Sequence, residues 1–220
     1  MKSLRPGWTR LTRKESGPEL LLKQLEGLKA ENALLNKQVE YLGNHVGIDH
    51  LTGASNRSVF EHELEHALKV IRGEIVEHRS NGEVAKEISL IFVDLDHFKQ
   101  INDTYGHPIG DEVLKRVSAL LVDSVRETDM VARVGGEEFV VLLRGADETF
   151  AAHAAEKFRA KIEQLSFPST PGLTLTASFG VCSSQTSTDA KKLYGHADKA
   201  LYHAKHGGRN RVVIHGKYNA

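Results

Sequence analysis

The apolar run from Ile88 to Asp96 constrains the fold more than any other stretch of this chain. Its residues are almost all aliphatic or aromatic until the acids at its end. A run with so few polar residues predicts a central strand buried on both faces, because a strand with one solvent face alternates apolar and polar side chains. The strand would carry Asp94 to its carboxyl end, where ligands usually bind in open α/β sheets. Asp94 is therefore a candidate metal ligand.

A glycine pair, Gly135 and Gly136, lies between two further apolar segments and predicts a tight hairpin. Glu137 and Glu138 follow directly, so the hairpin presents two carboxylates at its tip. Adjacent glutamates repel each other unless a cation lies between or beside them, and the pair therefore indicates a site for positive charge. An ordinary exposed turn is the alternative. The flanking strands are expected at residues 129–134 and 139–143.

The composition is typical of a soluble globular domain with an appendage: 220 residues, zero formal net charge and 40% hydrophobic residues. No apolar run is long enough to cross a bilayer, and the N-terminus lacks the apolar core of a secretory signal. We therefore expect a cytoplasmic protein that binds no membrane. The single cysteine, Cys182, can form neither an internal disulfide nor a cysteine metal cluster, and we interpret it as a core residue.

The N-terminal segment divides into a basic tail and a helix. Residues 1–14 carry lysine and arginine without an acid, which would suit an anionic partner. A solvated terminus is the simpler interpretation, and we assign residues 1–17 to a flexible tail. Ser16, Pro18 and Glu19 then form the pattern of a helix start, with a capping residue, a proline in the first turn and a capping-box acid.

Residues 18–47 have the heptad pattern of a two-stranded parallel coiled coil. The amide of Asn32, at an a position, can bond to its own copy across a parallel dimer and so penalises other registers. A helix packed on its own domain is the alternative. A DNA-binding zipper is excluded because Gly17 and Pro18 interrupt the continuous helix that such proteins need, and we expect no nucleic-acid partner. The d positions are Leu21, Leu28, Leu35 and Leu42, and the a positions are Leu25, Asn32, Val39 and Val46.

A helix predicted at residues 56–77 contains His62, Glu63 and His66 in the HExxH spacing of zinc peptidases. This spacing puts both imidazoles on one face of a helix, with the glutamate nearby as a base. No second metal motif follows at a recognisable distance, and the same helix has an ordinary apolar stripe. A zinc peptidase is therefore a remote alternative, and a solvated helix face is preferred.

The remaining periodicities predict an α+β domain with a ferredoxin-like βαββαβ order and an added helix and strand. We expect helices on one face of the sheet and an open second face. The first strand and the hairpin would lie side by side at the centre, where Asp94 and Glu137 could share a divalent cation. Helices are expected at 97–103, 111–127, 148–165 and 190–206, a turn at 104–110, and strands at 173–182 and 211–214.

Residues 49–215 resemble the GGDEF domain of diguanylate cyclases, a fold related to nucleotidyl cyclases and to the palm domain of polymerases. We assign this domain to residues 48–220. The departures are small: Ala54 replaces the usual leucine, and the loop before the first strand is a little long. The resemblance rests on five segments in the expected order: Asp49-x-Leu-Thr-Gly-x-x-Asn-Arg57; Asp94-Leu-Asp-His-Phe-Lys-Gln-Ile-Asn-Asp103 continuing to Gly110-Asp111; Arg126-x-x-Asp129; Gly135-Gly-Glu-Glu-Phe139; and Ala197-Asp-x-Ala-Leu-Tyr-x-Ala-Lys205-x-x-Gly-Arg-Asn210.

The resemblance implies condensation of two GTP molecules into cyclic di-GMP, with release of pyrophosphate. Each subunit of a homodimer would bind one GTP, so that each ribose 3′-hydroxyl attacks the α-phosphate of the other nucleotide. The parallel zipper would hold the two half-sites at high effective concentration. A catalytically silent receptor for GTP or cyclic di-GMP is the main alternative.

The resemblance also implies a role for individual residues. Asp94, the carbonyl of Leu95 and Glu137 offer hard oxygen ligands for Mg²⁺, with Mn²⁺ as a possible substitute. Glu138 is either a further ligand or the group that deprotonates the hydroxyl. The other assignments are Asn102 and Asp111 for guanine, Phe98, Lys99, Lys205 and Arg209 for phosphate, and Gly135 and Gly136 for close approach of the nucleotide to the turn.

Arg126 and Asp129 have the spacing of the family's inhibitory site, where cyclic di-GMP would bind as feedback inhibitor. Arg126 would contact guanine acceptors and Asp129 guanine donors. In an arbitrary protein such a pair is more often an ion pair at a helix end. Lys157 stands where some relatives use arginine, and its lack of a planar fork predicts weaker inhibition.

Overall fold

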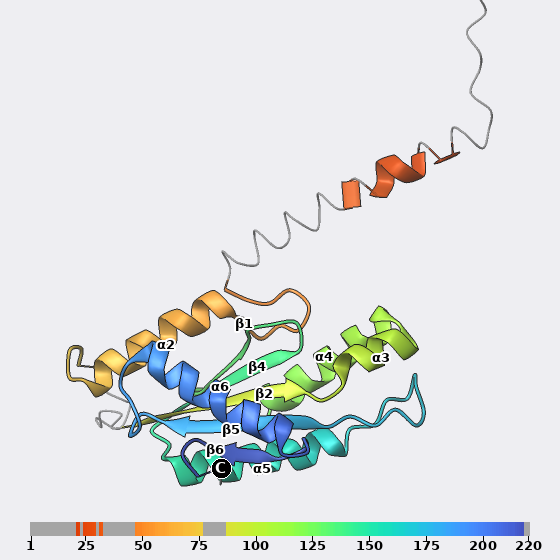
Figure 1. Ribbon diagram of the computed structural model, residues 1–220. Coiled ribbons are helices and arrows are strands. Elements are labelled where there is room, and N and C mark those ends of the chain that lie inside the picture. The colour runs from red at the N-terminus through yellow and green to blue at the C-terminus, as the bar shows by residue number, and fades with distance from the viewer. Residues whose placement is uncertain (1–20, 23, 30, 33–46, 77–86, 218–220) are drawn as a thin grey trace, which may run out of the picture. The chain divides into compact units, whose positions relative to one another are not determined.

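The computed structural model describes residues 21–22, 24–29, 31–32, 47–76 and 87–217 (Figure 1). The chain divides into two units, residues 1–42 and 43–220, which we describe separately. The described residues of the first unit are helical. In this helix the heptad leucines Leu21, Leu25 and Leu28 are 67%, 49% and 63% exposed. The basic tail and the later heptad positions, Leu35, Val39, Leu42 and Val46, lie outside the described residues.

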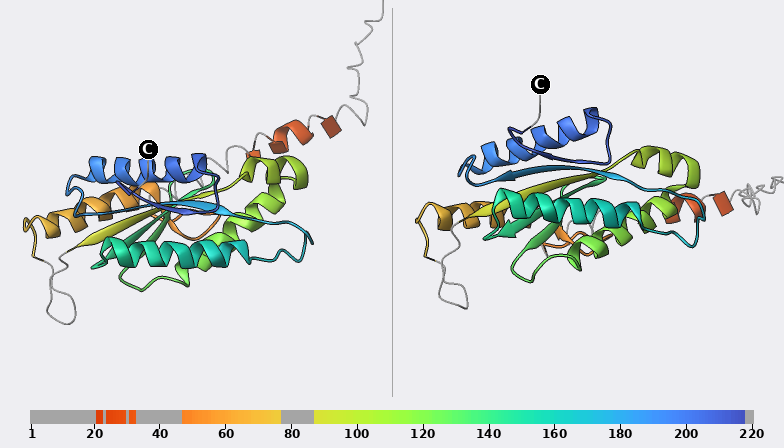
Figure 2. Two further views of the ribbon diagram at one scale, coloured as in Figure 1. Left: turned by 60° about the horizontal axis from the view of Figure 1, so that its bottom comes forward. Right: turned by 90° about the horizontal axis from the view of Figure 1, so that it is seen from below.

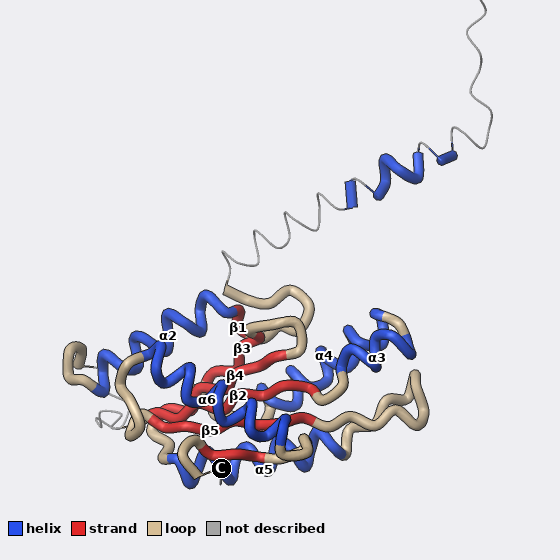
Figure 3. Tube along the Cα trace, viewed as in Figure 1, coloured by secondary structure: helices blue, strands red, loops and turns tan. Residues whose placement is uncertain are grey.

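The second unit is built on a six-stranded sheet with the order β1-β3-β4-β2-β5-β6 (Figures 1 and 3). β2 pairs antiparallel with β4 and β5, whereas the outer pairs β1–β3 and β5–β6 are parallel. The predicted βαββαβ order is confirmed from β2 to β5, and the added helix α6 and strand β6 follow it. The strands are β1 Ser55–Asn56, β2 Ile88–Leu95, β3 Met130–Arg133, β4 Glu138–Arg144, β5 Ala177–Ser183 and β6 Val212–Ile214; the helices are α2 Arg57–Ile71, α3 Phe98–Tyr105, α4 His107–Val122, α5 Glu148–Glu163 and α6 Ala190–His206.

Every residue of β2 is buried, because helices cover both faces of the sheet (Figure 2). Ile91 and Val93 belong to a core with α4 and α5, whereas Leu90 and Phe92 belong to a second core with α2 and α6. The predicted buried central strand is confirmed, but the predicted open face is wrong. Its cover comes from the apolar stripes of α2 and α6, which supply Phe60, Leu64, Leu193 and Leu201.

α6 lies close against β5 because Gly180 has no side chain. A Cβ atom at this position would overlap the backbone of Ala197 and Leu201. The helix begins at Asp189, whose carboxylate accepts from the amide of Lys192, and it ends with basic residues in its last turn. Close packing on the sheet therefore fixes where this basic last turn lies.

The main error in the predicted elements is the turn at 104–110. α3 continues to Tyr105 and α4 already begins at His107, so that only Gly106 separates them. Gly106 has a φ of 84°, a left-handed conformation that glycine adopts without strain, and Pro108 suits the first turn of α4. Smaller differences are α2 ending at 71 rather than 77, α4 at 122 rather than 127, and β5 beginning at 177 rather than 173.

Cys182 is buried in the core of α2 and α6, as predicted. Burial raises the pKa of its thiol to about 12, so the thiolate does not form near neutral pH. No helix in the described ranges has the length and apolar character needed to cross a membrane.

Candidate active site

Three acidic residues meet where β2 ends. In the β2–β4 ladder Asp94 lies opposite Glu138, and the amide of Leu95 donates to the carbonyl of Glu137 at 3.3 Å. The predicted neighbourhood of Asp94 and the hairpin is thus observed. The residue directly across the ladder is Glu138, whereas Glu137 lies one position further along the tip.

Lys205 supplies the positive charge nearest to this group. Its ammonium lies 2.7 Å from a carboxylate oxygen of Asp94, and it comes from the last turn of α6. Asp94 is almost completely buried, while Lys205 is about one-third exposed. The packing of α6 on β5 therefore brings a cation to the end of β2.

The electrostatics of the site show more negative than positive charge. Burial raises the pKa of Asp94; Lys205 opposes this effect, and the nearby charges of Glu138 and Asp96 add to it. The pKa of Glu137 is likewise raised, first by burial and then by Asp94 and Glu138, against the opposing charge of Lys205. The charge of Lys205 does not offset burial and the neighbouring acids, since the pKa values of Asp94 and Glu137 remain raised, so the site favours the approach of further positive charge.

The donor set fits a hard divalent cation. Carboxylate and main-chain carbonyl oxygens are the ligands that Mg²⁺ and Mn²⁺ accept, and the carbonyl of Leu95 adjoins Asp94. Within the described ranges, no group of three or more His, Cys, Asp or Glu side chains is arranged so that it could hold a metal ion by itself, and this includes the acids at the end of β2. Mg²⁺ usually takes several of its ligands from phosphate and water.

Gly135 lies against the side chain of Glu138, a contact that the sequence did not reveal. Neither Gly135 nor Gly136 has a positive φ, so the turn itself does not demand glycine. A Cβ atom at Gly135 would instead overlap the carboxylate of Glu138, whereas nothing lies within 4 Å at Gly136. Gly135 therefore makes room for a functional side chain, and Gly136 leaves open space above the turn.

An ion pair that sequence reasoning missed braces the hairpin. One guanidinium nitrogen of Arg133 lies 3.1 Å from Asp49, and the other donates to the carbonyl of Gly136 at 2.7 Å. Asp49 also accepts from the amide and hydroxyl of Thr52. The available signal was the arginine directly before the glycines, together with an aspartate at the start of the domain.

The residues predicted for guanine lie on two adjoining helices. Asn102 is on α3 and Asp111 is in the first turns of α4. The side-chain oxygen of Asn102 lies so close to Gly110 that a Cβ atom there would overlap it. Gly110 therefore lets the amide of α3 approach the segment that carries Asp111.

The residues predicted for phosphate come from two ends of helices. Phe98 is buried and begins α3, and Lys99 follows it in an exposed position. The first amides of a helix have no carbonyl partner within it, so these two N–H groups can receive an anion. Arg209 is exposed, follows α6 and has a φ of 62°.

Asp96 is a second residue that sequence reasoning missed. It is buried and accepts from the hydroxyls of Thr176 and Ser178 at 2.8 and 2.7 Å, and from the amide of Asn210 at 3.0 Å. These bonds satisfy the carboxylate within the fold. The available signal was its place two residues after Asp94, at the end of a strand.

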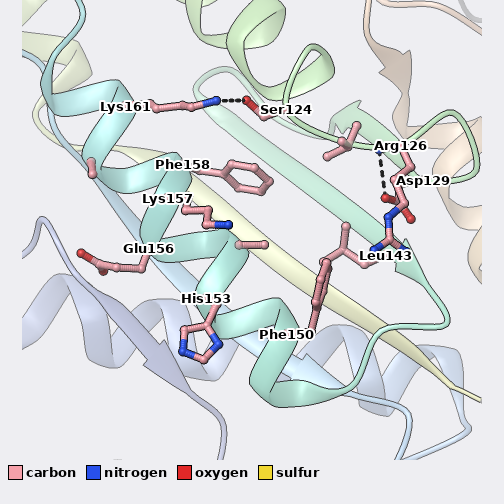
Figure 4. A pocket seen from close by; sticks show the side chains of 13 residues that line it. Ser124, Arg126, Asp129, Leu143, Phe150, His153, Glu156, Lys157, Phe158 and Lys161 are labelled. Carbon is pink, nitrogen blue, oxygen red and sulfur yellow. Dashed lines mark hydrogen bonds between the residues drawn. The ribbon is translucent and has the colours of Figure 1, made fainter.

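Arg126 and Asp129 line a separate pocket of about 720 Å³ beside α5 (Figure 4). The guanidinium of Arg126 lies 5.0 Å above the ring of Phe150. Asp129 accepts from the amides of Arg126 and Arg144 at 3.1 and 3.0 Å. In the described part of the chain the side chains of Arg126 and Asp129 form no ion pair with each other. The alternative interpretation of this motif, an ion pair at a helix end, is therefore not observed.

Lys157 also lines this pocket, together with His153, Glu156 and Lys161 of the same helix (Figure 4). Lys161 donates to the hydroxyl of Ser124 at 2.9 Å. The pocket therefore combines an aromatic ring with cationic side chains from two segments.

Within the HExxH segment, Glu63 has a structural contact. Glu63 pairs with Arg144 of β4 at 2.5 Å, which ties α2 to the sheet. Its carboxylate is therefore committed to packing, and the described residues gather no cation site around His62 and His66.

The comparisons with known proteins agree with one another. The sequence profile of the family described as "Diguanylate cyclase, GGDEF domain" matches residues 46–211. Diguanylate cyclase DosC of Escherichia coli strain K12 is 36% identical over 188 residues, which cover 82% of this chain and 38% of the relative. This chain thus spans about two-fifths of that relative's length.

Two solved structures share the fold. The coiled coil and GGDEF domain of DgcB from Caulobacter crescentus, solved with c-di-GMP, has a TM-score of 0.68 and 29% identity, covering 88% of this chain and 98% of that one. The active GGEEF domain of a diguanylate cyclase from Vibrio cholerae has a TM-score of 0.64 and 30% identity, covering 74% of this chain and 98% of that one.

Proposed function

Because this chain belongs to the GGDEF-domain family of diguanylate cyclases, we propose that it condenses two GTP molecules into cyclic di-GMP. Each ribose 3′-oxygen forms a bond to the α-phosphorus of the other nucleotide. The bond between that phosphorus and the bridging oxygen of the β-phosphate breaks, and pyrophosphate leaves. The reaction takes place twice, and it yields one cyclic product and two pyrophosphates.

The observation that carries this proposal is the proximity of Asp94, Glu137 and Glu138 at the end of β2, with Lys205 beside Asp94. Asp94, Glu137 and the carbonyl of Leu95 would hold Mg²⁺. When bound, the metal neutralises charge on the reacting phosphates. Glu138 either joins these ligands or accepts the proton of the 3′-hydroxyl, since a carboxylate can fill both roles.

The side chains around the acids would bind the rest of the nucleotide. Asn102 and Asp111 offer an acceptor pattern for the ring N–H and exocyclic amine of guanine, which adenine does not present. Lys205 and Arg209 add positive charge for the phosphates, and the first amides of α3 add N–H donors. The open space at Gly136 lets the nucleotide approach the turn.

One subunit carries only half of this reaction, so we also propose a homodimer through the N-terminal helix. Its exposed leucines follow the heptad, and leucine side chains in water are expected to seek an apolar partner. Replacing Leu25 and Leu28 by aspartate should lower the specific activity at nanomolar protein, with recovery at high concentration. Activity that is unchanged at every concentration would contradict this dimer.

The decisive assay mixes purified protein with GTP and MgCl₂ and measures pyrophosphate and cyclic di-GMP. We expect both products with GTP and neither with ATP. Glu138→Gln should abolish turnover, whereas Glu74→Gln, a matched change at an exposed ion pair, should not. GTP binding without any product would instead favour the silent receptor.

The pocket of Arg126 and Asp129 would bind the product as a feedback inhibitor. Guanine acceptors suit the guanidinium of Arg126, and the ring of Phe150 beneath it offers an apolar surface for a base. Inhibition of wild type and Arg126→Ala by added cyclic di-GMP tests this role. We expect at least about a tenfold weaker inhibition, because a charge-assisted contact is lost; equal inhibition would contradict it.

A further inference from the structure

The turn after α6 holds two consecutive residues in a left-handed backbone conformation. Arg209 has a φ of 62° and Asn210 a φ of 44°. Asparagine adopts this conformation readily, but arginine rarely does, because its Cβ approaches the following backbone. Strain of this kind persists only where surrounding contacts hold it, and it often marks functional segments. We therefore expect that hydrogen bonds of the neighbouring Asn210 offset the backbone strain at Arg209.

Asn210 makes three hydrogen bonds, each to a different residue. Its amide donates to a carboxylate oxygen of Asp96 at 3.0 Å. Its side-chain nitrogen donates to Glu163 at 2.8 Å, and its side-chain oxygen accepts from Arg159 at 2.9 Å. Both side-chain contacts lie on α5, so Asn210 links the turn after α6 to another helix.

The residues to which Asn210 bonds are themselves held in place by other contacts. Asp96 is buried and held by Thr176 and Ser178, and it lies two residues after Asp94. On α5, Arg159 pairs with Glu163 at 2.9 Å, one helical turn away. The turn is thus tied to the segment that carries the candidate metal ligand and to a rigid helix.

The charges near the site explain why such a link would matter. Lys205 already has an acidic partner, since its ammonium lies 2.7 Å from a carboxylate oxygen of Asp94. The guanidinium of Arg209 makes no hydrogen bond or ion pair with any described residue, so its charge is available for a ligand. A long exposed side chain loses rotamer entropy when it binds phosphate, and fixing its backbone lowers this cost.

We propose that Asn210 is a positioning residue, which holds the backbone of Arg209 so that its guanidinium meets the terminal phosphates of the nucleotide. The inference rests on the proposed function, because it takes a guanosine triphosphate as ligand. It assigns to Asn210 no contact with the substrate. Its effect should therefore appear in the discrimination between nucleotides with and without terminal phosphates.

The test measures binding of 3′-deoxy-GTP and 3′-deoxy-GMP in the presence of MgCl₂, by calorimetry. Neither ligand has the attacking hydroxyl, so neither can react. Asn210→Gly keeps the left-handed backbone accessible and removes the link to α5. We expect about a tenfold loss of affinity for the triphosphate and less than a twofold loss for the monophosphate.

The combination with Arg209→Ala separates positioning from a general loss of structure. If Asn210 acts through Arg209, adding Asn210→Gly to Arg209→Ala should weaken triphosphate binding no further. Glu163→Ala provides a second variant at the other end of the link and should reproduce the effect in part. Glu163→Gln, which keeps an acceptor, should bind like wild type. Thermal unfolding of each variant shows that binding is measured on folded protein.

Several results would overturn the inference: wild-type affinity for the triphosphate after Asn210→Gly, equal losses for both ligands, additive losses in the double variant, or a wild type that does not prefer the triphosphate. The product assay is independent of these results. If wild type forms cyclic di-GMP and Asn210→Gly keeps the wild-type preference for the triphosphate over the monophosphate, only the role of Asn210 is contradicted. If Asn210→Gly loses this preference but wild type forms no cyclic di-GMP, only the proposed cyclase activity is contradicted.

Discussion

Asp94 and Asp129 lie toward opposite ends of the β2–β4 ladder, and the fold treats them differently. Asp94 lies opposite Glu138 at one end, whereas Asp129 bonds to the amide of Arg144, which pairs with Ile88 at the other end. Asp94 has one cationic partner and acidic neighbours. In Asp129, by contrast, each carboxylate oxygen accepts a hydrogen bond from a main-chain amide.

The difference distinguishes a carboxylate suited to binding a ligand, Asp94, from a carboxylate that stabilises the fold, Asp129. A buried carboxylate beside other acids costs stability, so its presence indicates binding or catalysis. A carboxylate that accepts main-chain amides stabilises a turn whether or not a ligand binds. Of the two residues in the proposed inhibitory site, Arg126 is therefore the better variant position for a test of ligand binding.

The largest effect should follow from Asp94→Asn. We expect cyclic di-GMP formation to fall by about a thousandfold, because a metal ligand and its charge contribute several kcal/mol to the transition state. The melting temperature should stay the same or rise, since the change removes a buried charge that neighbouring acids repel. Turnover and thermal unfolding of the same preparation check both parts. A large loss of stability would show that Asp94 serves the fold, and the contrast with Asp129 would fail.

Asp129→Ala should reverse this pattern. Two main-chain amides lose their acceptor, so the free energy of unfolding should fall by about 1–3 kcal/mol. Asp129→Asn keeps one oxygen acceptor and should lose less. Urea unfolding of the two variants beside wild type measures the difference. Equal stability of all three proteins would show that Asp129 does not stabilise the fold, and the contrast with Asp94 would fail.

The contact of Arg133 with Asp49 and with the Gly136 carbonyl allows a test of how the charge of Asp49 stabilises the hairpin. Burial alone would raise the pKa of Asp49, but the hydrogen bonds from Thr52 and the charge of Arg133 outweigh it and lower the pKa below its ordinary value of 3.8. A lowered folded-state pKa gives stability that is present above the unfolded-state value and is lost as pH falls through the folded-state value.

We therefore expect wild type to exceed Asp49→Asn in stability at pH 7 by about 1 kcal/mol, and the gap to shrink below about pH 4. Urea unfolding of both proteins at a series of pH values gives the curve. A gap that is independent of pH would show that the charge of Asp49 adds nothing to the brace.

The central strand and the hairpin could be predicted from sequence because their signals are local. An apolar run ending in acids and a Gly-Gly-Glu-Glu segment each restrict what a few adjacent residues can form. The cover on the second face of the sheet could not be predicted, because it depends on Gly180 letting α6 approach β5. The roles of Asp96 and Arg133 also escaped, since their partners are distant in sequence and no spacing rule points to them.

The smallest effect concerns Lys157, which lines the proposed inhibitory pocket with Arg126 and Phe150 (Figure 4). An ammonium presents a point charge, whereas a guanidinium can make two parallel bonds to a phosphate or to guanine and can stack on a ring. Lys157→Arg should therefore strengthen inhibition by cyclic di-GMP about threefold to tenfold, a gain of roughly 1 kcal/mol. Inhibition curves for Lys157→Arg, Lys157→Ala and wild type provide the measurement. If cyclic di-GMP inhibits Lys157→Ala as strongly as wild type, the ammonium of Lys157 takes no part in binding. The pocket would then recognise its ligand through Arg126 and the aromatic surface alone.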